Sequence, residues 1–146
     1  MRLIDNFRRI LVAVEDSECS TRVIARASSI AAIVSSDVHL ISVIEVPWTI
    51  SSEKELETPE IQFETKKLID YQKDLIEEYL AGCNLNAKSH VSYGNPANEI
   101  LDYADAIDAD LIVIGRGEFH RIPRLFLGSI SEKVMKNAKC SVMIAR

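Results

Sequence analysis

Hydrophobic positions along this chain fall into short continuous runs, which alternate with longer segments where apolar residues recur every three or four positions. The run 8–14 is rich in β-branched residues, as is typical of a strand covered on both faces. Similar runs predict strands at 38–46, 86–93, 111–114 and 141–145. Stripes with a 3.6-residue period predict helices at about 20–34, 59–81, 96–107 and 128–137. The polar segment 47–58 is expected to be an irregular loop.

Local signals support these boundaries. Pro59 suits the first turn of a helix, and Gly82 marks its end. Asn95 followed by Pro96 is typical of an N-cap and a first-turn proline. The predicted strand at 86–93 is more polar than the other predicted strands and is therefore expected at a sheet edge. Strand and helix alternate from end to end, so the sequence predicts a doubly wound α/β fold, an open parallel sheet with helices on both faces.

In such a sheet, ligands bind outside the carboxyl ends of the strands, where the strand order reverses. The first and fourth strands each end in a polar or glycine-rich turn, so they are expected to form the walls of that crevice. The length of 146 residues indicates a single domain, 1–146, that can bury a core without disulfides.

Composition narrows the functional classes. A net charge of −5 argues against general nucleic-acid binding. Between 116 and 139, however, the sequence contains six Lys or Arg residues and only two acidic residues, and this local positive charge favours a small anionic ligand. No apolar run is long enough to span a membrane, and no signal peptide is visible, so a cytoplasmic protein is expected. The three cysteines have no metal-ligand or disulfide spacing and are interpreted as reduced, small buried side chains.

The segment 115–131 has the chemistry of a phosphate cradle. Gly115, Gly117 and Gly128 allow a backbone to approach an anion closely, and Ser129 and Ser131 would add hydroxyl donors at the start of a helix. The alternative, that Gly115 only turns the chain and Gly128-Ser129 only caps a helix, remains open from the residues alone.

Three segments together carry a family resemblance. The sequence ILVAVEDSE at 10–18 resembles the opening strand and turn of the universal stress protein family, and GNPANEI at 94–100 resembles its G-x-P-A-x-x-I segment. The stretches 109–115 and 127–134, followed by 138–142, are similar to its C-terminal half. The resemblance covers nearly the whole chain in the right order.

This resemblance implies an adenine nucleotide alpha hydrolase-like fold with five parallel strands in the order 3-2-1-4-5 and four helices. It also implies a cytosolic homodimeric module of stress response or regulation. Its ligand would be ATP or a related adenine nucleotide, with Mg²⁺ accompanying the nucleotide. The residues carried over as the nucleotide site are Ala13, Val14, Glu15, Val43, Ile114, Gly115, Arg116, Gly117, Gly128, Ser129, Ile130 and Ser131.

Two segments depart from the family's nucleotide-binding sequence, namely the pattern G-x2-G-x9-G-[ST] and the first turn. Glu118 stands where the middle glycine is expected, with a glycine one place early at Gly117. Glu15 and Asp16 replace the aspartate and glycine of the first turn. The alternative is therefore a dimeric interaction protein of the same fold that does not bind ATP.

The sequence shows no catalytic or metal-binding constellation. Ser17 lacks the G-x-S-x-G setting of a hydrolase nucleophile, and the histidines lack metal-ligand spacing, so His39 and His90 are interpreted as structural. A slow ATPase is the most that the enzyme hypothesis allows. The acidic positions of 60–78 are expected to form a solvated helix face.

The strand 141–145 is short and apolar, and the order 3-2-1-4-5 places it at a sheet edge. Soluble proteins cover or blunt such edges. Antiparallel pairing of two copies across a two-fold axis would satisfy both edges, so a homodimer through 141–145 is expected.

Overall fold

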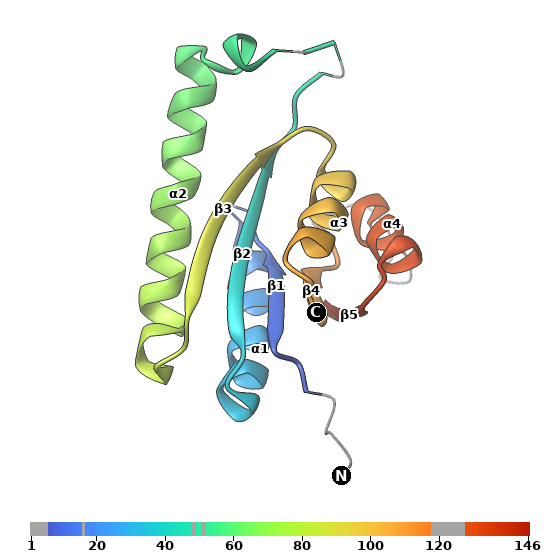
Figure 1. Ribbon diagram of the computed structural model, residues 1–146. Helices are drawn as coiled ribbons and strands as arrows, with labels where there is room; N and C mark the ends of the chain where they lie inside the picture. The colour runs from blue at the N-terminus through green and yellow to red at the C-terminus, as the bar shows by residue number, and fades with distance from the viewer. Residues whose placement is uncertain (1–5, 16, 48, 51, 118–127) are drawn as a thin grey trace.

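The computed structural model describes residues 6–15, 17–47, 49–50, 52–117 and 128–146. Its five strands form one parallel sheet in the order β3-β2-β1-β4-β5, which confirms the predicted order (Figure 1). The strands are β1 (Arg9–Ala13), β2 (Asp37–Ile44), β3 (Ala87–Tyr93), β4 (Leu111–Gly115) and β5 (Ser141–Ala145). The α-helices are α1 (Glu18–Val34), α2 (Pro59–Tyr79), α3 (Pro96–Ala106) and α4 (Ser129–Asn137).

Helices cover both faces of the sheet. Ile10 and Val12 of β1 point into a core shared with α1 and α2, whereas Leu11 points into a second core shared with α3 and α4. All three side chains are fully buried. Because both faces of the strand are covered, the sequence at this strand is a continuous apolar run and not an alternating one.

Side chains cap two helices at the predicted places. The side chain of Thr58 accepts a hydrogen bond from the Ile61 amide at the start of α2, and Pro59 occupies the first turn. Asn95 accepts one from the Asn98 amide in the same way at the start of α3. These bonds satisfy amides that have no partner inside the helix.

Gly94 joins β3 to α3 in a conformation that other residues rarely adopt, with φ of 144°. A Cβ at this position would lie 2.8 Å from Glu99 Oε1. The backbone angle therefore favours glycine here, and any larger residue would also displace the Glu99 carboxylate.

The structure differs from the sequence prediction in three details. The segment 47–58 contains a 3₁₀ turn, η1 (Glu53–Leu56), and α2 ends at Tyr79 before a second one, η2 (Ala81–Cys83). Cys83 is exposed in η2, so the expectation of a buried thiol is wrong there. Apart from these three differences, one polar side chain of α2 is fully buried, that of Gln72, which interrupts the apolar stripe on the inner face of the helix.

Candidate functional site

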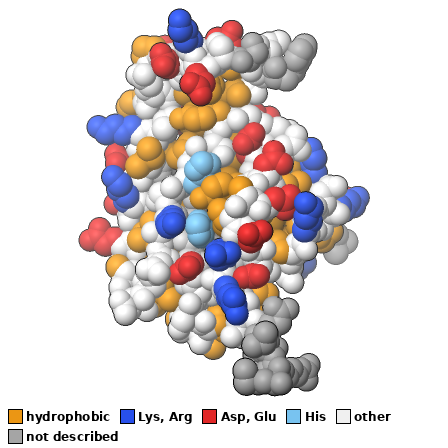
Figure 2. All heavy atoms as spheres, in the orientation of Figure 1, with side chains coloured by type: hydrophobic (Ala, Val, Ile, Leu, Met, Phe, Trp, Pro, Cys, Tyr) orange, Lys and Arg blue, Asp and Glu red, His pale blue; other side chains and the backbone are white. Residues whose placement is uncertain are grey.

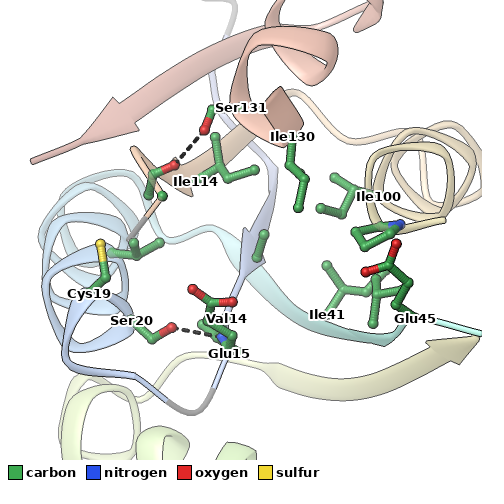
Figure 3. Close-up of a pocket in the computed structure, with 16 residues that line it drawn as sticks. Val14, Glu15, Cys19, Ser20, Ile41, Glu45, Ile100, Ile114, Ile130 and Ser131 are labelled. Atoms are coloured by element: carbon green, nitrogen blue, oxygen red, sulfur yellow. Dashed lines mark hydrogen bonds between the residues drawn. The ribbon is translucent and has the colours of Figure 1, made fainter. Parts of the chain in front are cut away.

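A cavity of about 250 Å³ opens at the carboxyl ends of β1, β2 and β4, where the strand order reverses. The first turns of α1, α3 and α4 complete its walls (Figure 3). It is lined by Ala13, Val14, Glu15, Cys19, Ser20, Val23, Ile41, Val43, Glu45, Pro96, Ile100, Ile114, Gly115, Gly117, Ile130 and Ser131. Segments about 100 residues apart in the sequence thus meet at one place.

The turn between β1 and α1 is held by hydrogen bonds on both sides of Glu15. The Glu15 amide donates to Ser20 Oγ at 2.7 Å. The Val14 amide donates to the Ile41 carbonyl at 2.9 Å, and Ser42 Oγ donates to the Val14 carbonyl at 2.8 Å. The backbone at 14–15 is therefore fixed against β2 and α1, and the Glu15 side chain lines the cavity.

Gly115 brings β4 close to α1. A Cβ on Gly115 would lie 3.1 Å from Cys19 Sγ and 3.2 Å from a methyl carbon of Val23. The close approach of strand and helix therefore accounts for the glycine, independently of any anion. Gly117, the glycine one place early, has φ of 96°, a conformation that favours glycine.

Hydrogen bonds join the two ends of the segment between β4 and α4. The Gly128 amide donates to the Arg116 carbonyl at 2.9 Å. Ser131 Oγ donates to the Gly115 carbonyl at 2.9 Å and lies 3.2 Å from the Arg116 carbonyl. The single hydroxyl hydrogen of Ser131 is thus used within the protein, where it ties α4 to the end of β4.

Most of the sequence-derived site residues meet at this cavity. Arg116, Gly128 and Ser129 belong to the same two segments but are not among the described residues that line it. Glu118 and Asp16, the two residues in the expected glycine positions, lie outside the described residues.

Sequence reasoning missed seven lining residues, which are Cys19, Ser20, Val23, Ile41, Glu45, Pro96 and Ile100. A signal existed for some of them. Ile41 and Val43 alternate along β2 and so share one face, and Glu45 continues this spacing directly after the strand. Pro96 and Ile100 are one helical turn apart in the segment that resembles G-x-P-A-x-x-I.

The described wall of the cavity carries hydrogen-bond acceptors. Glu15 and Glu45 contribute carboxylates, and no Lys or Arg occurs among the described lining residues. Two cations of the 116–139 cluster are engaged elsewhere, since Lys136 Nζ lies 2.9 Å from Glu132 Oε1 and Lys139 Nζ 3.3 Å from Asp105 Oδ2. This wall suits a neutral ligand moiety that brings donors, such as hydroxyl or amino groups.

A second cluster of polar side chains lies between the sheet and α3, and it consists of His39 of β2, His90 of β3 and Tyr103 of α3. The His90 ring stacks on Tyr103, with ring centroids 4.1 Å apart, and His39 Nδ1 lies 3.4 Å from the Tyr103 hydroxyl. Figure 2 shows histidine side chains among hydrophobic ones on this face.

Within the described part of the chain, no three His, Cys, Asp or Glu side chains are grouped closely enough to hold a metal ion. No described helix is long and apolar enough to cross a membrane.

The chain has relatives of similar length among curated proteins. It is 28% identical to a universal stress protein of Methanocaldococcus jannaschii, over 96% of this chain and 82% of that protein. It is 29% identical to the universal stress protein YxiE of Bacillus subtilis, over 96% of this chain and 99% of that one.

Solved structures share the fold. The universal stress protein UspA from Lactobacillus plantarum superposes with a TM-score of 0.83 at 24% identity, covering 98% of this chain and 100% of that one. A universal stress protein in complex with cAMP gives 0.75 at 19% identity, over 97% and 99%. The universal stress protein from Archaeoglobus fulgidus in complex with dAMP gives 0.69 at 23% identity, over 96% and 98%. The sequence profile of the family matches residues 6–146, and this chain therefore belongs to the universal stress protein family.

Proposed function

We propose that this protein binds ATP or a related adenine nucleotide in the cavity at the carboxyl ends of β1, β2 and β4. The observation that carries the proposal is the convergence of the β1–α1 turn, the end of β4 and the start of α4 on one cavity at the reversal of strand order. The structural neighbours in complex with cAMP and dAMP support it, because they have the same fold and hold adenine nucleotides.

In this proposal the two ends of the nucleotide meet different walls. Ala13, Val14 and Val43 border the adenine, and Glu15 accepts hydrogen bonds from the ribose hydroxyls. The phosphates extend toward Ile114, Gly115, Arg116 and Gly117 on one side and toward Gly128, Ser129, Ile130 and Ser131 on the other. Backbone amides at the start of α4 favour negative charge there. Mg²⁺ would enter with the phosphates, since the described residues offer no metal site of their own.

We further propose that the bound nucleotide serves as a signal and not as a substrate. The protein would act as a cytosolic homodimer in stress response or regulation, paired through β5. No catalytic residue is assigned, and hydrolysis would at most be slow.

Titration calorimetry tests the proposal directly. Mg-ATP is expected to bind more tightly than AMP, because the additional phosphates reach the basic segment that follows β4. A preparation denatured after purification is also expected to release nucleotide that absorbs at about 260 nm. Equal affinities for ATP and AMP would show that the outer phosphates make no net contribution, and no binding up to millimolar ATP would contradict the proposal.

A second candidate is a dimeric interaction protein that has no nucleotide. The observation in its favour is the pair of carboxylates, Glu15 and Glu45, in a described wall without Lys or Arg. Carboxylates oppose a phosphate that comes close to them. Under this alternative the protein sediments as a dimer and calorimetry detects no adenine nucleotide.

A further inference from the structure

Gln72 of α2 is a buried amide between two apolar contacts of the same helix, Leu68 and Leu75. It is fully buried, and its Nε2 donates to Ser42 Oγ at 2.8 Å and to the His90 carbonyl at 2.9 Å. Its Oε1 is buried too and has no hydrogen-bond partner among the described residues. The side chain thus reaches from α2 to both β2 and β3.

The partners fix the direction of every hydrogen bond in this group. A backbone carbonyl can only accept, so the nitrogen end of the Gln72 amide must face His90. Ser42 Oγ then accepts from the same nitrogen. The hydroxyl hydrogen of Ser42 remains for the Val14 carbonyl, 2.8 Å away. Gln72 therefore orients the Ser42 hydroxyl toward the strand that leads into the cavity.

This chain of bonds ends at the wall of the candidate site. Val14 lines the cavity, and Glu15 follows it directly. The neighbouring residue Tyr71 makes a second, longer contact from α2, since its hydroxyl lies 3.4 Å from the Ser17 carbonyl at the end of the same turn. Two consecutive residues of α2 therefore hold the two ends of the β1–α1 turn.

Gln72 makes opposing contributions to stability. Its buried Oε1 has no partner among the described residues, which is destabilising, whereas its Nε2 supplies a donor to the His90 carbonyl that a methionine of similar volume would not replace. What the amide provides, and an apolar side chain cannot, is the pair of donated hydrogen bonds and the direction that they impose on Ser42.

We propose that Gln72 is a positioning residue, which acts through Ser42 to hold Val14 and Glu15 in place at the cavity. The consequence for ligand affinity rests on the proposed nucleotide binding, whereas the effect on the turn does not. Through this link, binding of a ligand in the cavity and the packing of α2 against the sheet affect each other.

The experiment compares Gln72→Met with Leu75→Met, a volume-conserving change on the buried face of the same helix. Amide hydrogen exchange is measured in the ligand-free proteins over residues 14–20, where the amides of Val14, Glu15, Ser17 and Ser20 are hydrogen-bonded within the protein. Gln72→Met is expected to change the unfolding temperature little, because removal of the unpaired Oε1 offsets loss of the donor to the His90 carbonyl, while exchange over 14–20 becomes several-fold faster. Exchange over 141–145 serves as an internal reference and is expected to remain unchanged.

Ligand affinity gives the second measurement. Gln72→Met is expected to weaken ATP binding about fivefold, the effect of losing the support of roughly one neutral hydrogen bond. Ser42→Ala is expected to weaken it at least as much, and Ser42→Thr, which keeps the hydroxyl, to retain most of it. The double variant Gln72→Met with Ser42→Ala is expected to be no worse than Ser42→Ala alone, because both act in one chain of bonds.

Unchanged exchange over 14–20 in Gln72→Met would overturn the proposal, as would an equal effect of Leu75→Met. Additive losses in the double variant would also overturn it, since they would place the two residues in separate roles. If the unsubstituted protein binds no adenine nucleotide, the proposed function is wrong, and the exchange measurement alone still decides the role of Gln72.

Discussion

Cys19 Sγ lies 3.1 Å from the position that a Cβ on Gly115 would occupy, so β4 and α1 touch at the rim of the candidate cavity through a residue without a side chain. Val23, one turn further along α1, is nearly as close at 3.2 Å. Both contacts are tighter than ordinary van der Waals contact, and the space left for a methyl group is small.

Gly115→Ala is therefore expected to destabilise the protein by about 1–3 kcal/mol through overpacking between β4 and α1. Urea unfolding followed by circular dichroism measures this. In the Cys19→Ala background the cost should be smaller, because the sulfur that opposes the new methyl group is absent. An equal cost in both backgrounds would show that Cys19 is not the opposing group.

Nucleotide binding should protect Cys19 from alkylation, because Cys19 lines the cavity. Iodoacetamide labelling with and without ATP, read by peptide mass spectrometry, measures the rate at each cysteine. The rate at Cys19 is expected to fall at least several-fold with saturating ATP. Cys83 is exposed in η2, outside the cavity, and provides the internal control with an unchanged rate. Equal rates at Cys19 with and without ATP would place the nucleotide elsewhere.

The histidines beside α3 make stability depend on pH. Burial lowers the pKa of His39 and of His90 below their ordinary value of 6.5. Lys88 lowers the pKa of His39 further and Arg9 also lowers it, whereas Asp37 raises it. The unfolded chain therefore takes up protons more readily than the folded protein as the pH falls below 6.5, and the free energy of unfolding should decrease over that interval.

His90→Phe keeps an aromatic ring against Tyr103 and removes one titrating group, so it should weaken the pH dependence of unfolding between pH 7 and 5. Glu99 acts in the opposite direction, because burial, followed by Asp102, raises the pKa of its carboxyl above 4.5. The stability that Glu99 contributes is therefore lost as the pH rises from 4.5 through its raised pKa. Urea unfolding at a series of pH values measures the slope. A slope equal to that of the unsubstituted protein would exclude His90 as a source.

Met143→Pro tests the proposed homodimer. Proline removes a backbone donor and cannot extend a ladder, so pairing of β5 with a second copy should fail. Sedimentation is expected to show a monomer, provided that circular dichroism shows a folded protein. Phe63→Ser removes an exposed apolar side chain on α2 and should leave the dimer intact. A folded Met143→Pro variant that still sediments as a tight dimer would place the interface away from β5.

Glu118→Gly tests whether the carboxylate at the expected middle glycine of the pattern weakens the binding of nucleotide phosphates. A carboxylate about 5 Å from a phosphate charge, at an effective dielectric constant of about 20, costs roughly 3 kcal/mol. Removing that charge is expected to raise ATP affinity at least tenfold in calorimetry. An unchanged or lower affinity would mean that the Glu118 carboxylate does not oppose the phosphates.

Local patterns in the sequence determined the elements of this fold. The β-branched runs, the 3.6-residue stripes and the Asn95-Pro96 start of α3 act through neighbours a few residues away, so they can be read without knowing the rest of the structure. The family resemblance added the strand order and the segments of the candidate cavity, because those segments resemble the family in order and spacing.

Only the tertiary structure decided what individual side chains do within that frame. Glycine is needed at 115 because β4 contacts α1 there, about 100 residues earlier in the chain. The hydroxyl of Ser131 donates a hydrogen bond to the carbonyl of Gly115. In the sequence, Gln72 is only a polar residue that interrupts an apolar stripe. In the structure, it donates a hydrogen bond to Ser42, 30 residues away. Periodicity shows which face of an element is covered, whereas a hydrogen bond between distant segments depends on how the packed layers bring those segments together.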